Sequence, residues 1–162
     1  MFLERTSAIV ERIVFSNSSS GTFRSATTSN GTDFWVATSA NGVVHATYGG
    51  STGTQIAGTT PGPGTNNTRV VEVERGQLYV STGSSTFHGP CTVGSGLPTT
   101  AGQPMTLLSG FPTASRSAYD FWFANANTVY VADDNNNGAG GIAKWTQSGG
   151  AWTLAYTLTE GA

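Results

Sequence analysis

The chain is poor in charge, in cysteine and in long apolar runs, and each shortage excludes a class of protein. Only 10% of its residues are charged, against roughly 25% in an average globular protein. No basic run offers the positive surface that nucleic-acid binding needs. No apolar stretch approaches the roughly 18 residues of a membrane-spanning helix.

Cys91 is the single cysteine, which excludes an intrachain disulfide. The turn expected at Gly89 and Pro90 gives it no defined pairing with His88, so we expect an incidental thiol rather than a nucleophile.

Small and polar residues take the place of the missing charges. The chain holds 22 glycines and many threonines, serines and asparagines, which is typical of short strands joined by tight turns. Aromatic residues make up 10%, and a disordered chain carries few of them. Uncharged polar surfaces of this kind are also common in secreted proteins. Charges at Glu4, Arg5, Glu11 and Arg12 interrupt any signal-peptide core, so no export signal is expected within this chain.

Two nearly identical pentads, Asp33–Ala37 (DFWVA) and Asp120–Ala124 (DFWFA), indicate internal repeats. Each pentad opens a strand that is followed by a turn and a returning strand. Equivalent positions in a repeat predict that Trp35 and Trp122 both pack in the core between neighbouring units. For the aspartates that lead the two pentads we expect local turn or cap roles.

Strand and turn signals divide the chain into four segments. We expect an N-terminal segment with a half-blade hairpin at residues 1–28 and a first unit at 33–60. A second unit at 69–110 carries a long loop insertion over 83–104, and a third unit occupies 119–159. The segments 78–81 (LYVS) and 129–132 (VYVA) match at an offset of 51 positions. This offset predicts that they form the same strand of successive units.

The third unit has the clearest strand pattern. Four strand-like runs separated by turn residues fit into residues 119–159, and four short antiparallel strands of this kind make one blade of a β-propeller. In the second unit, Val71 and Val73 alternate with Glu72 and Glu74. This alternation predicts a strand whose glutamates lie on a solvated face.

The segments 128–134, 141–145 and 152–158 resemble the blades of bacterial extracellular β-propeller repeat proteins, and the similarity is strongest over 120–158. The resemblance implies an all-β fold of antiparallel four-stranded blades, an extracellular location and ligand or partner binding. It implies no single reaction. A closed propeller needs typically 4–8 blades, and about three and a half are recognisable here. We therefore expect a partial ring that belongs to a longer propeller, or a half-ring that self-associates, rather than a small closed ring.

Two sets of residues are candidates for binding sites. Asp133, Asn135 and Asn137 begin like a calcium loop, in which alternate oxygen ligands surround the ion. Calcium is thus a candidate cofactor, although Lys144 stands where the full motif has a glutamate, and the alternative is a polar hairpin loop. Trp145 and Trp152 are candidate ligand-binding residues that would stack on sugar rings, and the alternative is packing between adjacent strands.

No catalytic arrangement is recognisable in the sequence. None of the nine acidic residues forms an evident pair, and His45 and His88 lack the converging ligands of a zinc site. We therefore predict a non-enzymatic extracellular recognition module that binds a glycan or a surface protein through its loops. The alternatives are a propeller hydrolase or lyase with carboxylates near a central channel, and a structural surface-layer or adhesin repeat.

Overall fold

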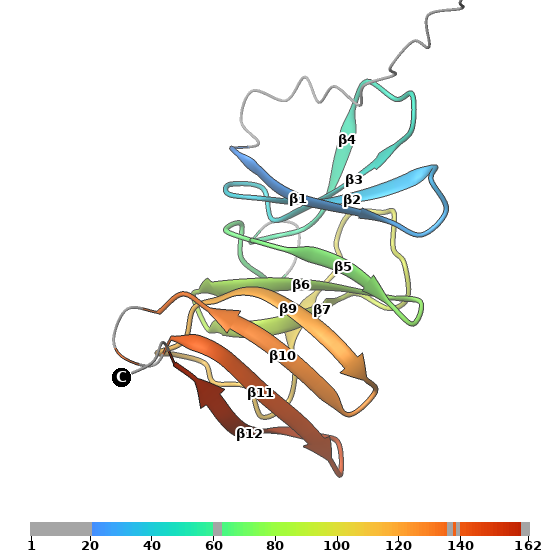
Figure 1. Cartoon of the computed structure of the whole chain (residues 1–162). Coiled ribbons are helices and arrows are strands. Elements are labelled where there is room, and N and C mark those ends of the chain that lie inside the picture. The colour runs from blue at the N-terminus through green and yellow to red at the C-terminus, as the bar shows by residue number, and fades with distance from the viewer. Residues whose placement is uncertain (1–20, 60–62, 136–137, 139, 160–162) are drawn as a thin grey trace, which may run out of the picture.

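The structure is a computed structural model that describes residues 21–59, 63–135, 138 and 140–159. Over these residues the chain is all-β, with three antiparallel four-stranded sheets and no helix (Figure 1). Each sheet is a meander of four consecutive strands. No helix in the described part of the chain is long and apolar enough to cross a membrane.

The first sheet consists of β1 (Phe23–Thr28), β2 (Asp33–Thr38), β3 (Val43–Thr47) and β4 (Gly53–Ala57). The expected separation of a half-blade at 1–28 from a unit at 33–60 is therefore wrong, because β1 pairs directly with β2. The Asn30 side chain closes the connecting turn by accepting the backbone N–H groups of Thr32 and Asp33, both at 2.8 Å. The other half of the expected hairpin, in residues 1–20, lies outside the described residues.

The second sheet consists of β5 (Val71–Glu74), β6 (Gln77–Ser84), β7 (Phe87–Val93) and β8 (Met105–Leu107). Strand β7 lies within the segment that the sequence predicts as a loop insertion, so that expectation is wrong. Gly89 and Pro90, which the sequence suggests as a turn, lie inside β7. A Cβ on residue 89 would lie 2.5 Å from the ring of Phe111, so close packing rather than a turn requires this glycine.

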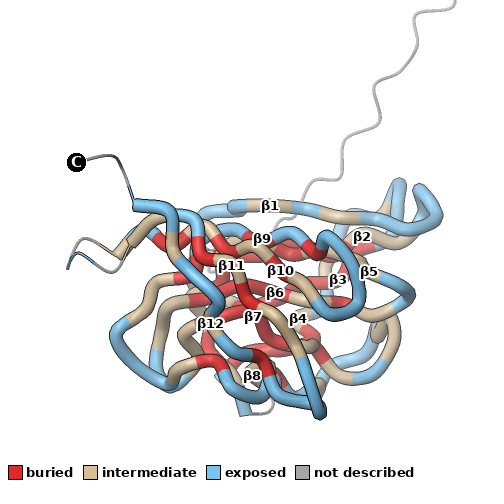
Figure 2. The backbone as a smooth tube through the Cα atoms, turned by 60° about the horizontal axis from the view of Figure 1, so that its bottom comes forward, coloured by how far each residue is buried: buried red, intermediate tan, exposed pale blue. Residues whose placement is uncertain are grey.

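The third sheet consists of β9 (Ala118–Asn125), β10 (Thr128–Asp133), β11 (Gly141–Ser148) and β12 (Ala151–Leu158), which are the four antiparallel strands that the sequence predicts. The second sheet lies between the other two (Figure 1). The first and second sheets enclose one apolar core, and the third sheet with the segment around β8 encloses another. Buried residues concentrate between the sheets, and β12 is largely exposed (Figure 2).

The two pentads occupy different places in their sheets. Trp35 lies on β2, the second strand of the first sheet, is 1% exposed and donates its indole N–H to the Pro98 carbonyl at 2.7 Å. Trp122 lies on β9, the first strand of the third sheet, and is 62% exposed. The expectation that both tryptophans are core residues is therefore wrong for Trp122. On β9 the neighbouring Phe121 points into the core instead.

Candidate functional site

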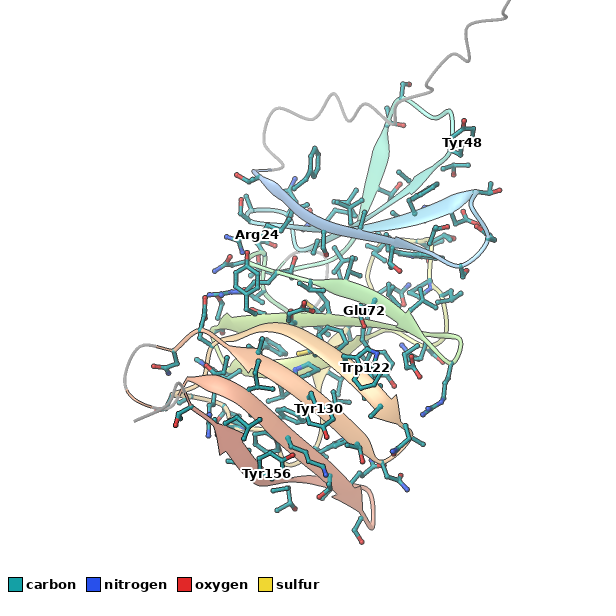
Figure 3. All side chains as sticks on the ribbon, in the orientation of Figure 1. Arg24, Tyr48, Glu72, Trp122, Tyr130 and Tyr156 are labelled. Carbon is teal, nitrogen blue, oxygen red and sulfur yellow. The ribbon has the colours of Figure 1, made fainter. Side chains whose placement is uncertain are left out.

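A row of large side chains crosses the open face of the third sheet. Trp122, Tyr130, Lys144 and Tyr156 are register partners on β9, β10, β11 and β12. The Trp122 and Tyr130 rings stack with centroids 6.2 Å apart, and the Lys144 ammonium lies 6.0 Å and 5.6 Å from the rings of Tyr130 and Tyr156. We call these four residues the aromatic ladder; its three rings follow one another across the sheet in Figure 3.

Strand alternation fixes which side chains reach this face. Along β9 and β10, Phe121, Phe123 and Val129 point into the core between sheets, so the residues between them point away from it. A second row on the open face contains Ile142, which is 44% exposed, and Leu158, which is 59% exposed. The ladder and this row form an exposed patch rich in apolar atoms.

A pocket of about 300 Å³ lies at one end of the ladder. It is lined by residues from β5, β9, β10 and β11, namely Glu72, Asp120, Phe121, Trp122, Tyr130, Ala132 and Ile142. Glu72 belongs to the second sheet and lies beyond the β9 edge of the third (Figure 3). The pocket therefore joins two carboxylates from different sheets to aromatic walls.

Glu72 is the electrostatically unusual group of the pocket. Burial raises the pKa of Glu72 to about 7, and the charges of Asp120 and Glu74 add to the increase. Within the described residues its side chain forms no hydrogen bond or ion pair. The expectation of a solvated face is therefore wrong for Glu72, because the third sheet covers part of it. Glu72 and Asp120 thus line the same pocket, although the sequence gives no sign that the two side chains meet.

The structure places Trp145 and Trp152 in the core, so the expectation that they form open sugar-stacking surfaces is wrong. They are 6% and 5% exposed. Phe111 stacks on Trp145 with ring centroids 4.1 Å apart, and Phe123 packs edge-on against Trp152 at 5.9 Å. Their positions on β11 and β12 point toward the second sheet, which leaves neither ring face free for a ligand.

In the predicted calcium loop, the two described side chains are bonded to a neighbouring loop. The Asp133 carboxylate is buried and accepts the backbone N–H groups of Ser117 and Asn135, both at 3.0 Å. The Asn135 amide donates to the Ser115 carbonyl at 2.9 Å. Asn137 lies outside the described residues, and among the residues that are described no group of three or more His, Cys, Asp or Glu side chains could hold a metal. Calcium binding at this loop stays a prediction.

The pairing of Asp33 with His45 was not visible in the sequence. The two side chains lie 2.9 Å apart across the β2–β3 hairpin. Hydrogen bonds hold the pKa of Asp33 below its usual value, and the bond from Asn30 has a larger effect than the bond from His45. Asn30 belongs to the β1–β2 turn, so the predicted turn role of Asp33 is combined with this cross-strand contact.

Cys91 is fully buried, and burial raises the pKa of its thiol well above the usual range. His88 instead places Nδ1 against the Arg116 carbonyl, so no nucleophile and base are brought together here. The aromatic ladder and its pocket thus remain the candidate functional site. No family model, curated protein or solved structure matches the chain.

Proposed function

We propose that this chain is a non-catalytic extracellular recognition module whose three sheets are propeller-type blades and which self-associates through the aromatic ladder. One observation carries the proposal. The ladder lies on the side of the third sheet that corresponds to the side of the second sheet that another sheet covers. Meander sheets that stack face on face are the building units of propellers. An end sheet without a neighbour exposes the face that a neighbour covers elsewhere in the stack.

Tyr79 and Tyr130 occupy equivalent positions in the second and third sheets. They are 51 positions apart, and each lies on the second strand of its sheet, β6 or β10. Tyr79 is covered by the third sheet, with its ring centroid 4.9 Å from that of Phe123 and 6.5 Å from that of Phe121. Nothing in the described chain covers Tyr130 from the same side, so its face offers the contact that Tyr79 already makes.

The composition of the patch also favours a protein partner. Exposed apolar patches on soluble proteins commonly mark interaction sites, and buried interface centres are enriched in Trp and Tyr and depleted in charge. Here Trp122, Ile142 and Leu158 are each at least 44% exposed on one face. A sugar makes its main contacts with rings and polar groups, whereas the aliphatic Ile142 and Leu158 suit another protein surface.

The test is the molar mass of the chain in solution, measured by light scattering and by sedimentation over a range of concentrations. We expect about twice the 16.7 kDa of one chain at high concentration, and at least tenfold weaker association after Trp122→Ser. The matched control is Tyr48→Ser, which removes a 50% exposed ring from the turn between β3 and β4 and should leave association unchanged. A mass of one chain at every concentration contradicts the proposal.

Glycan binding by the ladder is a second candidate, favoured by the stacked Trp122 and Tyr130 rings beside Asp120 and Lys144. Rings with a few polar groups around them are the usual lining of small-ligand sites. Retardation of the monomeric chain in gels that contain soluble polysaccharide, lost in Trp122→Ser and kept in Tyr48→Ser, would replace self-association by carbohydrate recognition.

A further inference from the structure

We propose that two copies of the chain meet face to face, third sheet on third sheet, with Lys144 of each copy opposite Glu72 and Asp120 of the other. This inference rests on the proposed self-association and specifies its geometry. It is carried by the order of charges along the ladder, by two charges that have no ionic partner among the described residues, and by the burial of the outer side of the first sheet.

The charges on the open face are arranged so that a two-fold axis pairs opposite signs. Glu72 and Asp120 lie at the Trp122 end of the ladder, in the pocket. Lys144 lies in the other half of the ladder, between Tyr130 and Tyr156. A two-fold rotation about an axis near Tyr130 places the Trp122 position of one copy over the Lys144 position of the other, so the acidic end of each copy faces the Lys144 side chain of its partner. Two-fold interfaces of this self-complementary kind are the commonest among homo-oligomers.

Both kinds of charge lack an ionic partner in the part of the chain that the structure describes. Neither Glu72 nor Lys144 forms an ion pair within the described residues, and the Lys144 ammonium lies over the rings of Tyr130 and Tyr156. A carboxylate held between two sheets without a cation is energetically unfavourable. An ammonium group of a second copy would compensate the charge that this chain leaves uncompensated.

The first sheet is poorly suited to cover the ladder in a front-to-back ring. Trp35 and Ala37 face the second sheet, so Val36 and its register partner Val44 point to the opposite side. Each is only 6% exposed, and Ala46 beside them is 2% exposed. That side therefore has little apolar surface left to bury against another copy, whereas the third sheet has a wide open patch.

The geometry predicts the sign of the pH dependence of association. The charged or titratable groups around Glu72 are Asp120 on β9, Glu74 on β5, Tyr79 on β6 and, farther off, Arg75 in the turn. The raised pKa of Glu72 means that it loses its proton near neutral pH. If Lys144 of the second copy faces it, association strengthens as pH rises from 6 to 8. If an apolar sheet covers it instead, association weakens over the same range.

The decisive experiment is charge reversal with mixing, measured by sedimentation of the full chain. Lys144→Glu alone and Asp120→Lys alone should each weaken self-association at least tenfold, because each homodimer then holds two repulsive pairs. An equimolar mixture of the two variants should recover nearly wild-type affinity, since both pairs in the mixed dimer are attractive. A front-to-back contact gives no recovery, because both substitutions lie on the same face.

Measurements without charge reversal test the same geometry in case a charge-reversed variant folds poorly. We expect about tenfold tighter association at pH 8 than at pH 6, weaker association in high salt, and loss of the pH effect in Glu72→Gln. Association that weakens toward pH 8, or a mixture that stays monomeric, overturns the face-to-face geometry and leaves the proposed self-association standing. A chain that is monomeric under all of these conditions overturns both.

Discussion

Replacing Glu72 by glutamine should stabilise the folded chain above neutral pH. The carboxylate lies between the second and third sheets, beside Asp120 and Glu74, and burial is the main cause of its raised pKa. Glutamine keeps the shape of the side chain and removes the charge that the site disfavours. The gain should therefore appear only where Glu72 is ionised, which makes pH the control variable.

The magnitude follows from the difference in proton affinity between the folded and unfolded states. The pKa is about 7 in the folded chain against 4.5 for the unperturbed group, a difference worth at most about 3 kcal/mol. The side chain keeps partial contact with water, so we expect ~1–2 kcal/mol. For a domain of this size that corresponds to roughly 3–8 °C in melting temperature.

The sign of the pH effect is fixed by which state loses its proton first. Below pH 4.5 Glu72 is protonated in both states and costs nothing. Between pH 4.5 and about 7 the unfolded chain ionises while the folded chain keeps its proton, so the stability of the wild type falls as pH rises. Above pH 7 the penalty is constant, and Glu72→Gln should be free of it throughout.

The assay is urea unfolding at pH 4.5, 6 and 8, followed by tryptophan fluorescence at a protein concentration too low for self-association. We expect the stability of wild type and Glu72→Gln to coincide at pH 4.5 and to separate by pH 8. Glu74→Gln is the matched control on the same strand and should keep most of the wild-type fall. Parallel pH profiles for the wild type and Glu72→Gln would refute the electrostatic reasoning.

Three further predictions concern the cores. Trp35→Ala should cost ~3–5 kcal/mol of stability in urea unfolding because it empties a buried site, whereas Trp122→Ala should change stability by less than ~0.5 kcal/mol. Thr68→Val should cost ~2 kcal/mol, since its buried hydroxyl bonds the backbone of Thr38 and Gly42; an equal effect of Thr68→Ser would point to lost packing instead. Cys91 should react with a thiol reagent only as fast as the chain unfolds, and rapid labelling of the native chain would contradict its burial.

Local chemistry allowed much of the fold to be predicted. The alternation of apolar residues and the turn residues gave an all-β chain and the four strands of the third sheet. The offset of 51 positions correctly matched β6 with β10 as second strands. Strand β7 was missed because Gly89 and Pro90 are typical turn residues, and their place in a strand depends on Phe111 from a distant loop. The pairing of β1 with β2 was missed because hairpin signals do not say which of two neighbouring units a strand joins.

The candidate site was much harder to predict than the fold. Alternation shows which residues share a face of a strand, but not which face another sheet covers. Trp122 was therefore expected in the core, and Trp145 and Trp152 on the surface, and the structure reverses all three. Glu72 was expected in solvent for the same reason. Each of these errors has one cause, which is that sheet-on-sheet contacts are made between residues far apart in the sequence.

The pocket brings together two features that are each unfavourable for an isolated chain. Trp122 exposes 62% of its surface, and Glu72 keeps an uncompensated carboxylate between two sheets. Among the described residues every buried side-chain N or O atom has a hydrogen-bond partner, and Trp35, Trp145 and Trp152 are buried in the two cores. Local violations of good packing and charge pairing tend to occur at functional sites. A second copy that covers the ring and supplies an ammonium group would remove both at once, whereas a neutral sugar would cover the ring and leave the carboxylate uncompensated.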